Sequence, residues 1–460
     1  MAIPLRPYLQ RAGLFIAVVA LASGCASYQA LPLNDHPHLP DSVAHLTIDA
    51  SRLPFPHLAA HVVDPADGLD MTGVAILAVL NNPALRLARA DANIVHAQAF
   101  AAGLLPDPQF NLSRDFPTQS GSGITNAYNA GIAYDINTLI THAATSTAAS
   151  AETHKADLNL LWQEWQVVAQ ARVLFSRAIS QEQLLHWLGK NRDLLAARYQ
   201  QSKAALAQGN LTADAADSAL IAWQDADRQL NDLQRQQSQT RHELDALLGL
   251  APNVVLKLID HATLRKLSDA AVEQASNDLA QRRPDLLALK AGYAAQDARY
   301  RQAILAQFPA FNLGLTHAQD TAGLVTNGFT LALTLPLLNG NRGNIRIEEA
   351  TRQRLHDEYE VRLNAARADV IRLLADRRLL SEQLDTLQQH LPDLDKAADR
   401  ARAALASGAL DTAGYVSFES VRIAKHVEAA NLQQALLENR IALLTLVGGD
   451  FPQLVTEKAK

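Results

Sequence analysis

The sequence contains one cysteine, at position 25, and no uninterrupted apolar run that approaches 18 residues. A single cysteine excludes an internal disulfide bond and leaves no thiol available for catalysis. A helix that crosses a bilayer takes about 20 apolar residues, so no segment qualifies as a transmembrane helix of ordinary length. If the chain is associated with a membrane, it is therefore either attached by a lipid or crosses the membrane as a β-barrel.

Positive charge and catalytic motifs are also scarce. Lys and Arg number 41 against 47 acidic residues, the formal charge is −6, and no basic run occurs. Nucleic-acid binding requires clustered Lys and Arg, so this partner class is not expected. Neither G-x-S-x-G, H-E-x-x-H nor the G-x-x-x-x-G-K-S/T phosphate loop is present. We predict that the protein is not an enzyme and has neither a cofactor nor a metal site.

The N-terminal segment has the layout of a secretory signal peptide. Arg6 and Arg11 precede the apolar run AGLFIAVVALA, and small residues lead to Cys25. The sequence LASGC resembles the lipid-attachment box of bacterial lipoproteins, with Ala22 where Leu usually stands. We predict removal of residues 1–24 and lipidation of Cys25. The alternative is an ordinary signal peptide followed by a cysteine by chance.

Helix-breaking residues are missing over long stretches. No proline lies between Pro117 and Pro252, and Gly189 and Gly209 are the only glycines in residues 132–248. A single helix over 142–208 would measure on the order of 100 Å, at about 1.5 Å per residue. Apolar residues recur at spacings of three and four along this stretch and its return: Leu158, Leu161, Trp165, Val168, Phe175, Ile179, Leu230, Leu233, Leu244 and Leu247, with Arg172 at one position of the series. This pattern predicts antiparallel coiled-coil hairpins that turn near Gly209 and Gly408.

The chain is internally duplicated. Residues 82–112 align with 283–313 at a constant offset of 201, which superposes Pro83 on Pro284 and FNL on FNL. Further on, AQGNL at 207–211 aligns with ASGAL at 406–410. Each unit of about 200 residues contains a helix, a strand pair and a long helical hairpin.

Two of the expected strands have unlike faces. In GFTLALTLPL the large residues Phe329, Leu331 and Leu333 alternate with small or polar residues such as Thr330 and Thr334. The first repeat has an equivalent strand at 125–136, in which Asn129 lies on the polar side. Four strands cannot close a membrane barrel, whose smallest form has about eight. Three chains would supply twelve strands, with Phe329, Leu331 and Leu333 toward lipid and Asn129, Thr330 and Thr334 toward the lumen. Surface hairpins on a soluble helical protein are the alternative.

The order of these parts, together with LLPDPQF before the first strand and LPLLNGNRGNIRIEEA after the last, resembles the TolC-like outer-membrane efflux proteins, in their lipoprotein branch. The resemblance runs from about residue 70 to 450. It implies a mainly α fold with a β-barrel part, in which a homotrimer forms a 12-stranded barrel and an α-helical tunnel. One departure is Asp135, which occupies the place of Pro336, so we expect that turn to differ locally.

The resemblance also implies a function. The protein would be the outer-membrane exit duct of a tripartite efflux system and would passively conduct substrates that an inner-membrane pump, for example of the resistance-nodulation-division type, and a periplasmic adaptor deliver. It would be lipid-anchored in the outer membrane, with its helical part in the periplasm. The alternative is a periplasmic adaptor lipoprotein, although adaptors normally carry one hairpin.

We expect the following organisation. The segments are a signal peptide (1–24), a lipid-anchored arm (25–70), a first repeat (71–255) with a β-hairpin at 106–137, an equatorial linker (256–275), a second repeat (276–450) with a β-hairpin at 308–338, and a tail (451–460).

Acidic residues beyond the helical turns are candidates for a pore constriction. In the family, carboxylates just past the second-repeat turn ring the periplasmic entrance. This sequence offers Asp411 after Gly408, and Asp214 and Asp217 after Gly209. Three-fold rings of carboxylates would favour cations. Solvated acids near a turn are an equally good interpretation. Five histidines cluster in the N-terminal arm: His36, His38, His45, His57 and His61. Such a cluster can bind metal, but it lacks acid or thiol partners at fixed spacing, and a solvated arm is the alternative.

Overall fold

The computed structural model describes residues 27–49, 51, 53–65, 67–119, 121–261, 264 and 268–448. Cys25 and the expected signal peptide and tail lie outside these residues. The chain divides into two compact units, Met1–Leu39 and Pro40–Lys460. The described part of the first unit, 27–39, contains no helix or strand.

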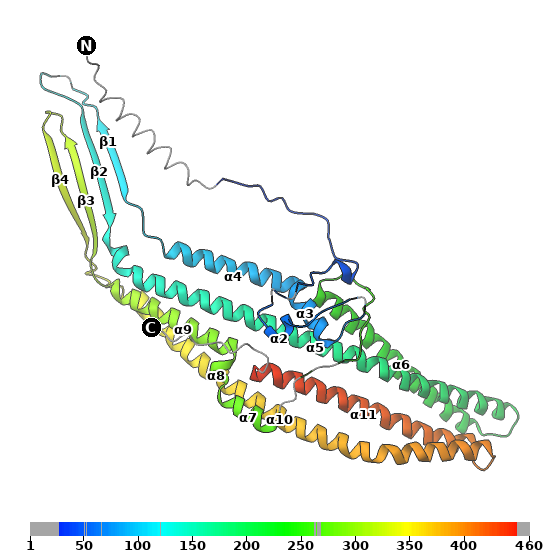
Figure 1. The fold of residues 1–460 in the computed structure, drawn as a ribbon. Coiled ribbons are helices and arrows are strands. Elements are labelled where there is room, and N and C mark those ends of the chain that lie inside the picture. Colours follow the sequence, from blue (N-terminus) through cyan, green and yellow to red (C-terminus); the bar gives the residue numbers. More distant parts are fainter. Residues whose placement is uncertain are drawn as a thin grey trace. The chain divides into compact units, whose positions relative to one another are not determined.

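The second unit is mainly helical and repeats the order of its elements (Figure 1). Short segments, η1 (Val43–His45) and α2 (Pro56–Ala59), precede α3 (Met71–Asn81). The first repeat continues with α4 (Pro83–Ala102), β1 (Gln109–Asp115), β2 (Ala127–Asp135), α5 (Ile136–Ala207) and α6 (Ala213–Leu248). After α7 (Asp269–Asn277) and α8 (Leu279–Arg282), the second repeat contains α9 (Pro284–Leu305), β3 (Ala310–Gln319), β4 (Val325–Thr334), α10 (Arg342–Ala406) and α11 (Thr412–Val447).

The four strands form one antiparallel sheet in the order β1-β2-β3-β4. The β2–β3 pairing joins the two repeats, with Ile132 opposite Leu315 and Ala130 opposite His317. Neither β1 nor β4 has a partner on its outer edge within the described chain. A single chain therefore leaves two strand edges available for pairing.

The long helices α5 and α10 contain 72 and 65 residues. The helical hairpins turn at Gly209 (φ 75°) and Gly408 (φ 72°), where the left-handed backbone favours glycine. Pro392 lies inside α10 without ending it. The fold class predicted from the sequence is therefore confirmed: long antiparallel helices and two β-hairpins per chain.

The main apolar core lies where α3 packs on α5. Phe55 and Trp165 meet at 5.4 Å between ring centroids, and the indole N–H of Trp165 donates to the carbonyl oxygen of Thr445 at 3.2 Å. Leu158, Trp165, Val168, Arg172 and Phe175 of the predicted periodic series are all buried, as are their four leucine counterparts on α6. A fully buried aromatic side chain contributes a large share of packing energy.

The two strand-to-helix junctions differ. In the first repeat, α5 starts directly after β2, and the Asp135 carboxylate accepts hydrogen bonds from the amide of Asn137 and the hydroxyl of Thr138, both at 2.9 Å. In the second repeat, seven residues separate β4 from α10, and Gly340 and Asn341 both have φ 53°. The local difference expected from Asp135 in place of Pro336 is present.

Candidate functional site: a two-faced sheet and the ends of the helical hairpins

The sheet has one apolar and one polar face. The register places Leu331 opposite Leu313, and Phe329 opposite Leu315, so these side chains share a face. We call this the apolar face; on the four strands it comprises Phe110, Leu112, Arg114, Tyr128, Ala130, Ile132, Tyr134, Phe311, Leu313, Leu315, His317, Gln319, Val325, Asn327, Phe329, Leu331 and Leu333. Most of its large apolar members are exposed, Phe329 by 67%, and the rest are half-buried. The structure confirms the predicted alternation.

The opposite, polar face carries small and hydrogen-bonding side chains. Asn129, Thr330 and Thr334, which we predicted to share a face, do so, and Gly131 and Gly314 lie among them. The strands place two charged residues on this face, Asp115 and Asp135, and no basic one. A surface of this composition is suited to water and carries negative charge.

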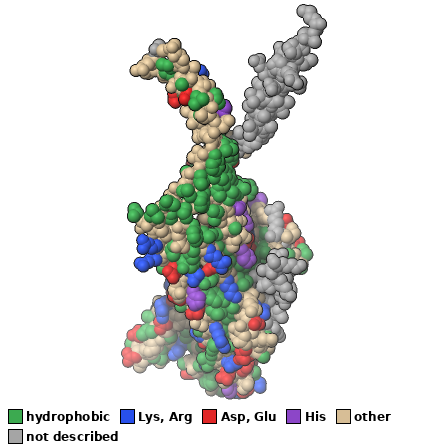
Figure 2. All heavy atoms as spheres, turned by 90° about the vertical axis from the view of Figure 1, so that its left-hand side faces the viewer, with side chains coloured by type: hydrophobic (Ala, Val, Ile, Leu, Met, Phe, Trp, Pro, Cys, Tyr) green, Lys and Arg blue, Asp and Glu red, His purple; other side chains and the backbone are tan. Residues whose placement is uncertain are grey.

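The exposed apolar surface continues beyond the strands. Leu335, Leu337 and Leu338 follow β4 and are 57%, 81% and 93% exposed, while Leu104 and Leu105 precede β1. Figure 2 shows hydrophobic side chains gathered at the junction between the sheet and the helices. Monomeric proteins rarely expose so large a contiguous apolar area, which marks an interaction surface.

The three candidate constriction residues lie at the other end of the helical hairpins. Asp411 is the N-cap of α11, and its Oδ1 accepts a hydrogen bond from the amide of Gly414 at 2.8 Å. Asp214 lies in the first turn of α6, and Asp217 follows one turn later; both side chains are exposed. Acids at an N-cap or in the first turn stabilise a helix N-terminus. In the single chain Asp411 and Asp214 have this role, whereas Asp217 lies beyond the first turn of α6. No contact among the described residues brings the three acids together.

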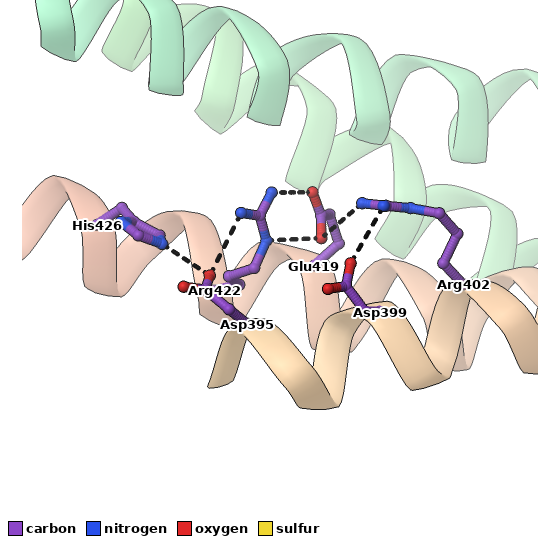
Figure 3. Close-up of polar contacts among 6 residues, drawn as sticks. All are labelled: Asp395, Asp399, Arg402, Glu419, Arg422 and His426. Atoms are coloured by element: carbon purple, nitrogen blue, oxygen red, sulfur yellow. Dashed lines mark hydrogen bonds and ion pairs between the residues drawn. The ribbon is translucent and has the colours of Figure 1, made fainter. Parts of the chain in front are cut away.

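A polar network that sequence reasoning missed connects α10 and α11 (Figure 3). Arg422 donates to both carboxylate oxygens of Glu419, at 2.9 and 2.5 Å, and approaches Asp395 at 3.5 Å. His426 Nε2 lies 2.9 Å from the same Asp395 oxygen. Further acids and bases extend the chain of contacts: Arg402 lies 3.2 Å from Asp399 and 4.0 Å from Glu419.

The network depresses the pKa values of its carboxyl groups. The hydrogen bond from Arg422 lowers the pKa of Glu419 and outweighs the opposing effect of burial. Burial raises the pKa of Asp395, but the contacts with His426 and Arg422 together hold it below its ordinary value. Both acids are therefore ionised at neutral pH, and they bind the two helices together through charge.

An aromatic contact extends the network to the first hairpin. The rings of Trp187 on α5 and His426 on α11 stack with centroids 4.4 Å apart and planes 8° apart. Lys190 and Arg422 lie over the same indole, at 5.1 and 5.4 Å from its centroid. Such cation–π contacts each contribute about 0.5–1 kcal/mol at exposed sites. The i, i+3 spacing of Glu419 with Arg422, and of Asp399 with Arg402, was the sequence signal for this cluster.

The described part of the chain offers neither a metal site nor a single membrane-spanning helix. No group of three or more His, Cys, Asp or Glu side chains there could hold a metal ion. His45 contacts Asp41 at 3.0 Å, and His61 contacts Asp70 at 3.2 Å, each as a separate pair. No single described helix has the length and hydropathy to cross a membrane, although the bent pair α3 and α4 meets both criteria jointly.

Comparisons with known proteins agree with this geometry. Residues 275–449 match the family model described as outer membrane efflux protein. The chain is 30% identical over 186 residues to the probable outer membrane lipoprotein SilC of Salmonella typhimurium, and this match covers 38% of the chain and 40% of SilC. The chain thus matches about two fifths of the length of its curated relatives.

Solved structures share the fold over most of the chain. Crystal structures of CusC superpose with a TM-score of 0.65 at 20% identity and cover 86% of this chain and 97% of CusC. The CmeC outer membrane channel of Campylobacter jejuni superposes with a TM-score of 0.69 at 14% identity, covering 94% and 96%. The resemblance inferred from the sequence is confirmed, and the fold is that of channel proteins.

Proposed function

We propose, on the premise that residues 275–449 belong to the outer membrane efflux protein family, that this chain is the outer-membrane exit duct of a tripartite efflux system. The observation that carries the proposal is the four-stranded sheet, which has one exposed apolar face and one polar face and continues into helices of 72 and 65 residues. The adaptor alternative lacks support, because both helical hairpins and the sheet match the channel fold.

The assembly would be a homotrimer. Free edges on β1 and β4 allow β1 of one chain to pair with β4 of the next, and three chains would then close a barrel of twelve strands. The polar faces would line a water-filled lumen, and the apolar faces would contact lipid. The helices would continue this lumen into the periplasm, with Cys25 providing a lipid anchor in the same membrane.

Partners would be a periplasmic adaptor and an inner-membrane pump, for example of the resistance-nodulation-division type. A matched relative from Escherichia coli O157:H7 is called cation efflux system protein CusC. Together with Asp115 and Asp135 on the polar face, this name supports cations as the transported class. We propose that the lumen favours them electrostatically.

Asp214, Asp217 and Asp411 would narrow the periplasmic end. Three copies would contribute nine carboxylates at the tips of the hairpins. Because Asp411 also caps α11, replacing it with Ala would remove a cap and a charge together. Replacing it with Asn keeps the cap, since Asn is an equally good N-cap residue, and removes only the charge.

Planar-bilayer recording of the detergent-purified protein tests these proposals. We expect stepwise conductance with cation preference, a trimer that migrates faster in SDS before heating, and extraction by detergent only. The triple variant Asp214→Asn, Asp217→Asn, Asp411→Asn should lose part of its cation selectivity, whereas Asp225→Asn, a change to an exposed acid of α6 outside the proposed ring, should not. Release of the delipidated protein into buffer would contradict the duct, and unchanged selectivity in the triple variant would contradict the gate.

A further inference from the structure

The apolar face of the sheet carries one charged side chain. Of the three charged residues on the four strands, Asp115 and Asp135 lie on the polar face. Arg114 pairs with Tyr128 and shares its face with Leu112 and Phe110. A charge on a lipid-facing strand position is unfavourable near the centre of a bilayer and costs little near its surface. Arg114 is therefore expected near a membrane surface. Its position beside the β1–β2 loop agrees with this expectation.

Arg114 has no anionic partner within the described chain. Its guanidinium lies 5.3 Å from the centroid of the Phe116 ring, and neither an ion pair nor a hydrogen bond to a described residue accompanies this contact. The neighbouring polar groups instead satisfy one another. The Tyr128 hydroxyl lies 3.1 Å from His317 Nε2, and His317 Nδ1 lies 2.7 Å from Asn327 Oδ1. The donors of Arg114 remain available to a ligand.

An apolar depression lies on the same face, closer to the helices. Its volume is about 280 Å³. It is lined by Pro108, Ile132, Ala133, Tyr134, Leu313, Gly314, Leu315 and Phe329. Ile132 pairs with Phe110, four residues before Arg114, so the depression begins about 13 Å from Arg114 at 3.3 Å per residue. Half of a hydrocarbon core of about 30 Å is a similar distance, so an acyl chain whose headgroup lies at Arg114 would reach the depression.

We propose that this face binds a phosphate-bearing lipid of the outer leaflet, with its phosphate on Arg114 and an acyl chain in the depression. A guanidinium binds phosphate through paired, charge-assisted hydrogen bonds, which would give the unpaired Arg114 a partner on an otherwise uncharged face. The proposal rests on the proposed function, because the sheet must lie in the outer membrane. A trimer would present three equivalent sites.

Native mass spectrometry of the detergent-purified, full-length protein with added lipid A tests the site. We expect up to three lipids per trimer. Arg114→Gln should weaken retention about fivefold, as expected for removal of one basic residue at a membrane surface. Arg114→Lys should retain most of it. Leu315→Trp, which fills the depression, should weaken retention without removing charge. Arg235→Gln, a change to a 72% exposed residue of α6, is the matched control and should have no effect.

The alternatives give different results. Equal retention by Arg114→Gln and the parent protein would overturn the proposal. Tighter binding of phosphatidylethanolamine than of lipid A would overturn the assignment to the outer leaflet. If inorganic phosphate displaced all of the bound lipid A, Arg114 would be a simple anion-binding site and the apolar depression would not contribute to binding. Conductance recorded on the same preparation separates the two proposals. If the trimer conducts and lipid retention does not depend on Arg114, only the proposed lipid site is contradicted. If retention depends on Arg114 but the trimer does not conduct, the proposed duct function is contradicted.

Discussion

The two helical hairpins have the same topology but place their acidic residues in opposite environments. In the first hairpin, Glu164 and Asp245 are 6% and 2% exposed, and burial raises the pKa of each. In the second hairpin, contacts with basic partners lower the pKa values of Asp395 and Glu419. Duplication therefore preserved the backbone path, while the balance of forces on these acids diverged. Burial outweighs the 2.7 Å ion pair of Glu164 with Arg89 in the first hairpin, and contacts with basic partners outweigh burial near the turn of the second.

The largest expected effect comes from the apolar core of the first repeat. Replacing Trp165 with Ala should lower the apparent free energy of unfolding by about 3–5 kcal/mol, because it leaves a cavity beside Phe55. Denaturant unfolding followed by circular dichroism measures this loss. Trp162→Ala, at a half-buried position one turn earlier, is the control and should cost clearly less. Equal losses of unfolding free energy in the two variants would mean that the burial of Trp165 does not determine its contribution to stability.

The next effect concerns the network of the second hairpin. Arg422→Ala leaves the carboxylate of Glu419, 9% exposed, without its bidentate partner, and should destabilise this region by about 1–3 kcal/mol. Hydrogen exchange should quicken in residues 395–426 and stay unchanged around Trp165. A variant that lacks both groups, Arg422→Met with Glu419→Gln, should recover much of the loss. Faster exchange throughout the chain would contradict a local role.

Acidification should separate the two hairpins. Asp395 and Glu419 have folded pKa values below their unfolded values, so their contribution is complete above about pH 4.5 and is lost as the pH falls through the folded pKa values. Glu164 and Asp245 have raised folded pKa values, so lowering the pH from 7 toward about 4.5 should stabilise the first hairpin.

Hydrogen exchange at pH 7, 5 and 3.5, corrected for intrinsic rates, measures both trends. We expect slower opening of the first hairpin at pH 5 and faster opening of the second at pH 3.5. Glu164→Gln should reduce the slowing of exchange in the first hairpin at pH 5. Glu419→Gln should reduce the acceleration of exchange in the second hairpin at pH 3.5. Parallel behaviour of the two hairpins would contradict the comparison.

The smallest effect concerns the helix starts. Asp411→Ala should cost about 1 kcal/mol by removing the N-cap of α11, whereas Asp411→Asn should cost only a few tenths. At the first hairpin, Thr212 makes no side-chain cap hydrogen bond, so Thr212→Ala should have less effect than Asp411→Ala. Thermal unfolding of the purified variants measures these differences. A larger loss in Thr212→Ala would show that cap geometry is not the cause.

Periodicity was sufficient to predict the strands and the helical hairpins. The alternation around Phe329 and the three-and-four spacing around Trp165 each show which residues share one face of a single strand or helix. The backbone geometry of that strand or helix alone determines which residues share a face. The turns at Gly209 and Gly408 were visible because only glycine adopts their backbone conformation readily.

Contacts between elements could not be predicted in the same way. The stacking of Trp187 on His426 joins residues 239 positions apart, and it depends on how the two hairpins rotate against each other. Asp411 was predicted to face a pore because of its position in the sequence. Its capping hydrogen bond with Gly414 became visible only when the helix start was known.

The length of α5 also has a mechanical consequence. Its 72 residues extend about 108 Å at 1.5 Å per residue, and one end is tied to the sheet through the Asp135 cap. As a rigid lever, such a helix moves its far end by about 2 Å for each degree of tilt at the sheet. Trp187 of α5 stacks on His426 of α11 with ring centroids 4.4 Å apart, and a tilt of two degrees would shift Trp187 by about 3 Å, which is enough to break the stack. The ends of the helical hairpins must therefore be positioned by contacts between the helices near the turns, because the attachment of α5 to the sheet cannot fix them that accurately.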